Sequence, residues 1–480
     1  MHLNMDGHGP LHAQLTRALK AALFAGTVGD GGRLPATRQL ARELGLSRNT
    51  VLAAYEQLRA EGFVAARVGS GSFVTPPVRP DAPAPTVRIE RPAQSAFARR
   101  GRRYHDHANM AGRPTPGMRY AFSYGVPYTN PALTNAWARE LSRAAAYTPP
   151  NYPMTQGLPA LRQAVCDYLA RRRGVQVVPE DVLIVAGTQQ AMALTARVLL
   201  DVGDGAVVEE PHYSAMREVL QIHGARVDAV DVDAQGLRLD RLPDPPPRLI
   251  YVTPSHQFPS GVVMSLERRL ALLDYARRHG CWIFEDDYDG EFRYDAQPLA
   301  ALRSLDRDGH VVYVGTFSKV LFPSLRLGYL VMPPGLREDY VTAKWQDDFG
   351  SPGIEQAALA NFIADGGFER HLRRTSRALE ERRAALMASL WRELGDELEL
   401  ADSRAGMHLV AWLRRFDAVQ GEQLIQRSRE CGVDIYPITP YYSRPPHRTG
   451  LLMGFASMSV MEIEHAVQRL AECVHAVARG

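Results

Sequence analysis

The chain has 480 residues, too many for one compact core, with 45% hydrophobic and 23% charged residues, a balance typical of globular proteins. No apolar run approaches the roughly 20 residues of a membrane span, and the N-terminus MHLNMDGHGP lacks the features of a secretory signal. The four cysteines are far apart and form no CxxC pair, so we expect neither a disulfide framework nor a metal site, and we expect a cytoplasmic protein.

The net charge of +3 hides an uneven distribution of charge along the chain. Residues 1–119 carry 17 Lys and Arg against 8 Asp and Glu, whereas the remaining residues carry 39 against 45. A basic N-terminal part on an acidic body predicts contact with a polyanion. On charge alone, a basic tail that is merely solvated is the alternative.

Hydrophobic periodicity divides the chain into three regions. Residues 8–75 are dense in helical patterns and end in a glycine-punctuated hairpin. Residues 76–119 are rich in Pro, Ala and Arg and poor in aliphatic side chains, so we expect a linker. In residues 120–480, short β-branched runs alternate with amphipathic helices, which predicts an α/β domain with a mostly parallel sheet.

The first region predicts a winged helix-turn-helix. Leucines at i, i+4 spacing mark one helix over residues 10–24. Thr37 is placed to cap a second helix and Ser47 a third, with a short turn between them. The sequence FVAARVGSGSFV, residues 63–74, then predicts two strands that form the wing.

Arginines are spread over the surface that this motif presents to DNA. The third helix exposes Arg48, Asn49 and Thr50 in its first turn, where a recognition helix contacts bases and phosphates in the major groove. Arg38 begins the second helix, and Arg67 lies in the wing. The alternative, a three-helix unit that serves only for packing, does not explain this distribution.

Residues 34–74, LPATRQLARELGLSRNTVLAAYEQLRAEGFVAARVGSGSFV, resemble the GntR-type winged helix. The resemblance extends over about 65 residues, and the matching residues are closely spaced along them. It implies that the chain binds double-stranded DNA and that Arg38, Arg48, Thr50 and Gly69 contact it; Arg67 is a weaker match.

The segment GTFSKVLFPSLRLGY, residues 315–329, indicates a cofactor site. Lys319 follows a predicted strand in a Thr/Ser-rich turn, where its amine is suited to form a Schiff base with an aldehyde. Thr316, Ser318 and Arg326 can hold a phosphate group. Because a Ser-Lys pair alone is usually a solvated loop, the inference depends on the segments that accompany it.

The segment WIFEDDYDGEF, residues 282–292, ends a buried strand with acidic groups. Pyridoxal phosphate needs a carboxylate at its pyridinium nitrogen, and Asp286 fits, with Tyr288 placed to bond the phenolic oxygen of the ring. Glu285 and Asp287 compete for the first role, since periodicity does not separate neighbours. An acidic metal-binding motif is less favoured because no His or further carboxylate cluster accompanies it in the sequence.

Two more segments complete the predicted cofactor site. In VAGTQQAMALTARVLL, residues 185–200, Gly187, Thr188 and Gln189 lie at a helix N-terminus, where backbone N–H groups bind phosphate. In EEPHYSAM, Tyr213 is an aromatic residue that could stack on the pyridine ring, or equally a tyrosine of the core.

Residues 120–475 resemble the fold type I aminotransferases. The resemblance implies a mostly parallel sheet with a smaller C-terminal subdomain, and pyridoxal phosphate as the cofactor. It matches Lys319 to the Schiff-base lysine and Arg326 to the phosphate arginine, and it repeats the roles given above to Asp286, Tyr288 and Tyr213. Tyr152, in NYPMTQGLPALR, matches a tyrosine that reaches the phosphate of the neighbouring subunit, which implies a homodimer.

Together the two halves resemble the MocR/GabR subfamily of GntR-type transcriptional regulators. The resemblance covers nearly the whole chain except the linker and is carried by TPSHQFPSG, EDDYDGEFRY and GTFSKVLFPSLRLGY. It implies a homodimer in which each winged helix packs against the large domain of its partner, and a regulator that binds an operator in DNA.

Two positions depart from the aminotransferase pattern. Phe258 stands where an asparagine is common, although His256 and Gln257 are near, and Met453 stands where a carboxylate-binding arginine is expected. Arg444 and Arg448 could substitute for that arginine. We therefore expect an amine or amino-acid effector, or pyridoxal phosphate itself, to be sensed at Lys319 without efficient turnover. A working aminotransferase with an accessory DNA-binding domain is the alternative.

Overall fold

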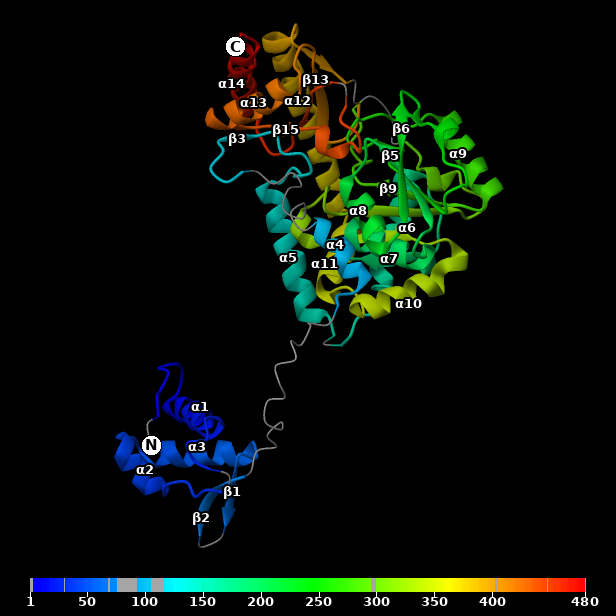
Figure 1. Ribbon diagram of the computed structural model, residues 1–480. Coiled ribbons are helices and arrows are strands. Elements are labelled where there is room, and N and C mark those ends of the chain that lie inside the picture. Colours follow the sequence, from blue (N-terminus) through cyan, green and yellow to red (C-terminus); the bar gives the residue numbers. More distant parts are fainter. Residues whose placement is uncertain are drawn as a thin grey trace. The chain divides into compact units, whose positions relative to one another are not determined.

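A computed structural model of the chain describes residues 3–29, 31–67, 70–75, 93–104, 115–149, 151–294, 299–401, 404–446 and 448–479. It consists of two compact units, Met1–Ala93 and Gln94–Gly480 (Figure 1). None of the described helices is both long enough and apolar enough to cross a membrane.

The small unit is a winged helix-turn-helix, as predicted. Its elements are α1 (Leu11–Phe24), α2 (Thr37–Leu44), α3 (Arg48–Ala60), β1 (Val64–Arg67) and β2 (Gly71–Val74). The two strands pair antiparallel, and the inward side chains of all three helices meet in one apolar core. Ser47 caps α3, since its Oγ accepts the N–H of Thr50 at 3.1 Å. The predicted cap at Thr37 is wrong: the extended residue before the helix is Ala36, so Thr37 already lies inside α2.

The large unit is built on a sheet of eight strands. They are β4 (Val182–Val185), β5 (Gly205–Glu210), β6 (Arg226–Asp233), β7 (Gly236–Leu237), β8 (Leu249–Val252), β9 (Trp282–Asp287), β10 (Val311–Thr316) and β11 (Gly328–Val331). Their order is β4-β11-β10-β9-β8-β5-β6-β7. β11 and β7 run antiparallel to their neighbours and the other pairs are parallel, so the predicted mostly parallel sheet is confirmed.

Helices cover both faces of this sheet. They are α5 (Pro131–Tyr147), α6 (Pro159–Arg173), α7 (Thr188–Leu199), α8 (Ser214–His223), α9 (Leu266–His279), α10 (Arg337–Asp348) and α11 (Gly353–Ala364). Alternate residues of β4 enter two different cores: Val182 and Ile184 pack with α5, α6 and α11, whereas Leu183 and Val185 pack with α7, α8 and α10. A sheet buried on both faces explains why its strands read as continuous apolar runs.

The C-terminal part forms a smaller subdomain around an antiparallel sheet in the order β12-β13-β16-β15. Its strands are β12 (Leu398–Leu400), β13 (His408–Leu413), β15 (Tyr436–Pro437) and β16 (Gly450–Gly454), and its helices are α12 (Gly367–Leu394), α13 (Ala418–Glu430) and α14 (Val460–Arg479). Nearby, β3 (Tyr120–Ala121) pairs in parallel with β14 (Val433–Asp434).

Part of the predicted linker belongs to the large unit. The helix α4 (Ala96–Gly101) packs on α8, where Arg100 Nε and Nη2 donate to the carbonyl oxygens of Ile222 and His223 at 2.7 and 3.0 Å. A side chain that caps a helix C-terminus orders a segment through polar contacts, which a composition poor in aliphatic residues does not reveal. Residues 76–92 and 105–114 lie outside the described residues.

Candidate functional site

A cavity of about 520 Å³ opens in the large unit near the carboxyl ends of β9 and β10. Ligands of parallel sheets bind at this end of the strands. The sequence-predicted residues that line it are Thr188, Gln189, Tyr213, Asp286, Tyr288, Thr316, Ser318, Lys319 and Arg326. Residues from α7, from the start of α8 and from the ends of β9 and β10 are thus brought together.

Lys319 follows β10 and reaches into this cavity. Its Nζ donates a hydrogen bond to the carbonyl oxygen of Gly125 at 3.0 Å. Gly125 has φ +78°, and a Cβ there would lie 2.6 Å from this Nζ, so a side chain at position 125 would collide with the lysine. Burial lowers the pKa of Lys319, although Asp289 and Asp286 oppose the shift. A lower pKa favours the uncharged amine, the form that attacks a carbonyl carbon.

Asp286 is the acidic residue of β9 that faces the cavity. Its Oδ2 accepts the hydroxyl of Tyr251 at 2.9 Å, and among the described residues its Oδ1 has no partner. Burial raises the pKa of Asp286 to about 7. A buried carboxylate with an open lone pair is suited to the pyridinium nitrogen, because a cation there would restore the charged form of the carboxylate.

The two competing carboxylates of β9 are engaged on the opposite face of the strand. Asp287 pairs with Arg173 at 2.6 Å and accepts the hydroxyl of Tyr313. Glu285 accepts the backbone N–H groups of residues 302 and 303 at 2.7 and 2.8 Å. Because side chains alternate along a strand, neither one lines the cavity.

The donors predicted for a phosphate lie together at the start of α7. Gly187, with φ +80°, precedes the helix, and a Cβ there would lie 3.0 Å from Nη2 of Arg326. That same nitrogen donates to the carbonyl oxygen of Ala186 at 2.8 Å. Ser318 Oγ is buried with no partner among the described residues. A guanidinium, a free hydroxyl and a helix N-terminus form a donor set that fits a phosphate.

Aromatic rings form one wall of the cavity. Tyr213 lies at the start of α8, and its ring meets that of Phe258 edge to face, with centroids 5.6 Å apart. Phe258 also packs edge to face against Tyr288 at 5.9 Å. Phe258 therefore contributes apolar surface where the aminotransferase pattern has a polar side chain. Gln257, its neighbour, does not line the cavity.

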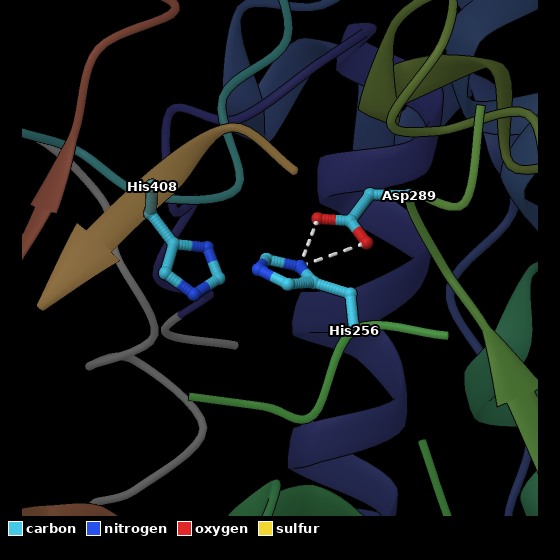
Figure 2. Close-up of side chains that lie close together, drawn as sticks. All are labelled: His256, Asp289 and His408. Atoms are coloured by element: carbon cyan, nitrogen blue, oxygen red, sulfur yellow. Dashed lines mark hydrogen bonds and ion pairs between the residues drawn. The ribbon is translucent and has the colours of Figure 1, made fainter. Parts of the chain in front are cut away.

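The structure also brings together three residues that sequence reasoning did not group. His256, Asp289 and His408 are buried and offer nitrogen or oxygen atoms that all lie within 4.8 Å of one another (Figure 2). The sequence placed no histidine beside the acidic motif, because His256 precedes it by a strand and a helix and His408 comes from β13. Asp289 could have been found, since it lies in the same EDDYDG segment as Asp286.

Several predicted residues lie outside the cavity. Tyr152 is 82% exposed, and its ring packs on that of Phe349 at 5.5 Å. Met453 is fully buried in an apolar core. Arg448 pairs with Glu399 at 2.6 Å, and Arg444 is exposed. Neither arginine lines the cavity, so neither supplies the missing carboxylate clamp there.

The predicted DNA-contacting side chains lie on the surface of the small unit. Arg38, Arg48 and Asn49 are exposed, and Thr50 is half-buried beside the cap of α3. Arg67 is exposed and lies over the ring of Phe73, 4.8 Å from its centroid. Gly69 falls outside the described residues.

A DNA-binding winged helix joined to an aminotransferase-type domain defines the class of this protein. Residues 11–74 match the family of bacterial regulatory proteins described as gntR, and residues 123–470 match aminotransferase class I and II. The chain therefore belongs to the GntR family of transcriptional regulators, in the MocR type that carries an aminotransferase domain.

Individual relatives support this assignment. The chain is 38% identical to the "Probable rhizopine catabolism regulatory protein MocR" of Rhizobium meliloti, across 98% of this chain and 94% of that protein. It is 31% identical to the pyridoxine biosynthesis transcriptional regulator PdxR of Corynebacterium glutamicum, across 98% of each chain. The crystal structure of LysN, an alpha-aminoadipate aminotransferase from Thermus thermophilus complexed with N-(5'-phosphopyridoxyl)-L-leucine, superposes with a TM-score of 0.69 at 28% identity, covering 79% of this chain and 98% of that one.

The cofactor of this domain is pyridoxal phosphate, and the cavity has the groups to hold it. Among the described residues, Asp286 has an oxygen without a partner and Ser318 a hydroxyl without a partner, and Lys319 offers an amine with a lowered pKa. When bound, pyridoxal phosphate supplies a carbon that amines attack and a ring that withdraws electrons from it.

Proposed function

We propose that this chain is a pyridoxal phosphate-dependent transcriptional regulator that binds an operator in double-stranded DNA and senses an amine at Lys319. The cavity carries the proposal. It gathers residues suited to the cofactor, yet the expected carboxylate-binding arginine is replaced by the buried Met453. Without a clamp that fixes the substrate, catalysis loses much of its advantage of orientation, whereas binding can still be read out as a signal.

The charges in the cavity favour an amine over an amino acid as the effector. Among the described residues that line it, the cations are Lys319 and Arg326, and both are assigned to the cofactor. The carboxylates Asp286 and Asp289 line the same cavity, but Asp286 is likewise assigned to the cofactor and Asp289 contacts His256. An effector carboxylate would therefore find no free cation to bind it, whereas an amine without a carboxylate needs none.

Lys319 links effector binding to a contact with the backbone of Gly125, which lines the same cavity. In the proposed resting protein the side chain of Lys319 holds the cofactor. An incoming amine that replaces Lys319 on the cofactor would release the lysine side chain. The freed Nζ can then donate to the carbonyl oxygen of Gly125, the contact of 3.0 Å described above. A contact made in one state and absent in the other is what lets a ligand shift a conformational equilibrium.

We further propose that the chain is a homodimer. Trp345, Phe349 and Tyr152 form an exposed aromatic cluster, with ring centroids 5.5 and 5.6 Å apart and each side chain at least half exposed. Clustered exposed aromatic rings are typical of protein interfaces. Tyr152 within this cluster is the residue assigned to the neighbouring subunit's phosphate, so its place fits a site completed across the interface.

A DNA footprint over the region upstream of the chain's own gene tests the proposal. We expect protection that changes when pyridoxal phosphate is added, and changes again with an amine. Matched pairs separate the effector classes: 2-phenylethylamine against L-phenylalanine, and ethanolamine against L-serine. The amines should act at concentrations about tenfold lower than the amino acids, the ratio that about 1.4 kcal/mol produces. If protection changed with pyridoxal phosphate but no amine changed it further, the cofactor itself would be the effector. The absence of any protected sequence would count against regulation.

The second candidate is a working aminotransferase with an accessory DNA-binding domain. It is supported by the cofactor end of the cavity, which is lined by Lys319, Asp286 and Arg326, the residues matched to the cofactor-binding residues of aminotransferases. Rapid multiple-turnover conversion of an amino acid with a keto acid would establish it. Either function requires the protein to be in the same compartment as the DNA that it binds, and we infer that this compartment is the cytoplasm.

A further inference from the structure

The hydrogen bonding around Tyr288 raises a question that the proposed cofactor site leaves open. Where aminotransferases have an asparagine that shares the cofactor's phenolic oxygen with this tyrosine, the chain has Phe258. The amide of Gln257 cannot replace it, since its Nε2 donates to the carbonyl oxygens of Pro211 and Phe258, each at 2.7 Å. Its Oε1 accepts from Ser260. The hydrogen bond to the phenolic oxygen therefore depends on Tyr288, whose hydroxyl proton must point toward the cofactor.

His256 lies directly behind the hydroxyl of Tyr288. Its Nδ1 is 3.0 Å from the tyrosine oxygen and 2.9 and 3.1 Å from the two carboxylate oxygens of Asp289. Figure 2 shows the imidazole between Asp289 and His408. His256 and Asp289 are each 1% exposed, so solvent competes little for these bonds.

The carboxylate fixes which atom carries the proton. An ionised carboxylate only accepts hydrogen bonds, so Nδ1 of His256 must be protonated to face it. A protonated Nδ1 has no lone pair to offer, and the hydroxyl of Tyr288 cannot donate to it. The tyrosine oxygen instead accepts a share of that N–H, and its own proton is directed away from His256.

We infer that Asp289 and His256 form a positioning pair that directs the hydroxyl proton of Tyr288 into the cavity, toward the phenolic oxygen of the cofactor. The inference rests on the proposed cofactor site and deepens it. The pair takes over the role of the missing asparagine indirectly, by making Tyr288 an obligatory donor. The sequence motif that contains Asp289 does not by itself predict that Asp289 positions Tyr288.

Two neighbours hold the pair in place. Gly406, with φ +76°, passes so close that a Cβ there would lie 2.1 Å from Cε1 of His256 and 2.5 Å from Oδ2 of Asp289. Two residues further along the chain, the ring of His408 lies 5.0 Å from that of His256, and Nε2 of His408 is 3.2 Å from the carbonyl oxygen of Pro259. Burial, with smaller contributions from the neighbouring His256 and Lys319, holds the pKa of His408 well below its usual range, so His408 stays neutral. The imidazole of His256 is thus packed in one orientation.

The test is an absorbance–pH titration of the cofactor bound to Lys319, with no DNA or effector present. The phenolic oxygen is stabilised in its deprotonated form by the donor Tyr288, so loss of that bond raises the midpoint of the titration. For Asp289→Asn we expect a rise of about one pH unit, the shift that a lost hydrogen bond to a charged group produces. The amide of the variant can donate to Nδ1 of His256, which permits the tautomer protonated at Nε2. The hydroxyl of Tyr288 is then no longer forced to direct its proton toward the cofactor.

A second variant decides whether the pair acts through Tyr288. Tyr288→Phe should raise the midpoint at least as much, and adding Asp289→Asn to it should give no further rise, because the two changes remove one interaction. Glu285→Gln is the matched control: it alters a buried carboxylate of the same segment that faces away from the cavity and should leave the midpoint unchanged.

Three outcomes would overturn the inference. An unmoved midpoint in a folded, cofactor-bound Asp289→Asn variant would show that the carboxylate does not act on the cofactor. Fully additive shifts in the double variant would show that it acts by another route than Tyr288. A midpoint of the unaltered protein that moves with a chelator would make His256, Asp289 and His408 a metal site instead. A protein with no cofactor absorbance at all would refute the proposed cofactor site itself, which is a different result.

Discussion

The two ends of the cavity differ in what they keep of an aminotransferase. At the cofactor end, Lys319, Asp286 and Arg326 have the groups and surroundings that pyridoxal phosphate requires. At the end where a substrate carboxylate would be bound, Met453 stands in place of the expected arginine and is buried in an apolar core. The difference has a structural basis: the cofactor residues come from the large sheet and its helices, whereas the clamp would come from β16 of the small subdomain. One end can therefore change without disturbing the other.

The largest effect is expected at the cofactor end, from Lys319→Ala. Removing the amine removes the covalent attachment, so the visible absorbance of the bound cofactor should disappear completely. DNA binding should persist, because the winged helix has its own core in a separate compact unit. Spectra and gel shifts on one preparation check both points. A visible band that survives in the variant would mean that the covalent site lies elsewhere.

At the other end, Met453→Arg tests whether the clamp can be put back. Because Met453 is fully buried in an apolar core, we expect the arginine to be an unpaired buried charge that costs about 3 kcal/mol or more of unfolding free energy. Met453→Leu is the control and should cost less than about 1.5 kcal/mol. Denaturant unfolding measures both. If Met453→Arg were as stable as the control and responded to amino acids, position 453 would be shown to open on the cavity.

The same contrast explains what could be predicted from the sequence. Lys319, Asp286 and the start of α7 lie in short local motifs whose strand–turn–helix context places them, and the structure brings them together. The roles of His256 and His408 depend on contacts between residues 152 positions apart in the chain, which no local pattern encodes. The docking of α4 on α8 was missed for a related reason, since it is made by one arginine on backbone carbonyls and not by an apolar stripe.

A smaller effect is expected from pH at the cofactor end. Burial raises the pKa of Asp286 to about 7 in the folded protein, above its ordinary value of 3.8. A raised pKa means that the folded state binds more protons, so this group's contribution to stability is present at low pH and is lost as pH rises toward about 7. Without cofactor, the chain should therefore lose about 2 kcal/mol relative to Asp286→Asn between pH 5 and pH 8. Unfolding curves at the two pH values measure the difference, and a difference that grows in the opposite direction would contradict it.

The smallest effect is expected from Arg448→Ala, which asks whether the substitute clamp exists. Arg448 pairs with Glu399 at 2.6 Å, with both side chains about half exposed, and lies over the ring of Trp412. Surface pairs of this kind contribute about 0.2–1 kcal/mol, so stability should change little. Because its charge is already engaged outside the cavity, the concentrations at which L-phenylalanine and 2-phenylethylamine alter the cofactor spectrum should not move. If Arg448→Ala selectively weakened the response to the amino acid, Arg448 would contact the effector. The effector end of the cavity would then keep a carboxylate-binding arginine, as the cofactor end keeps its aminotransferase residues.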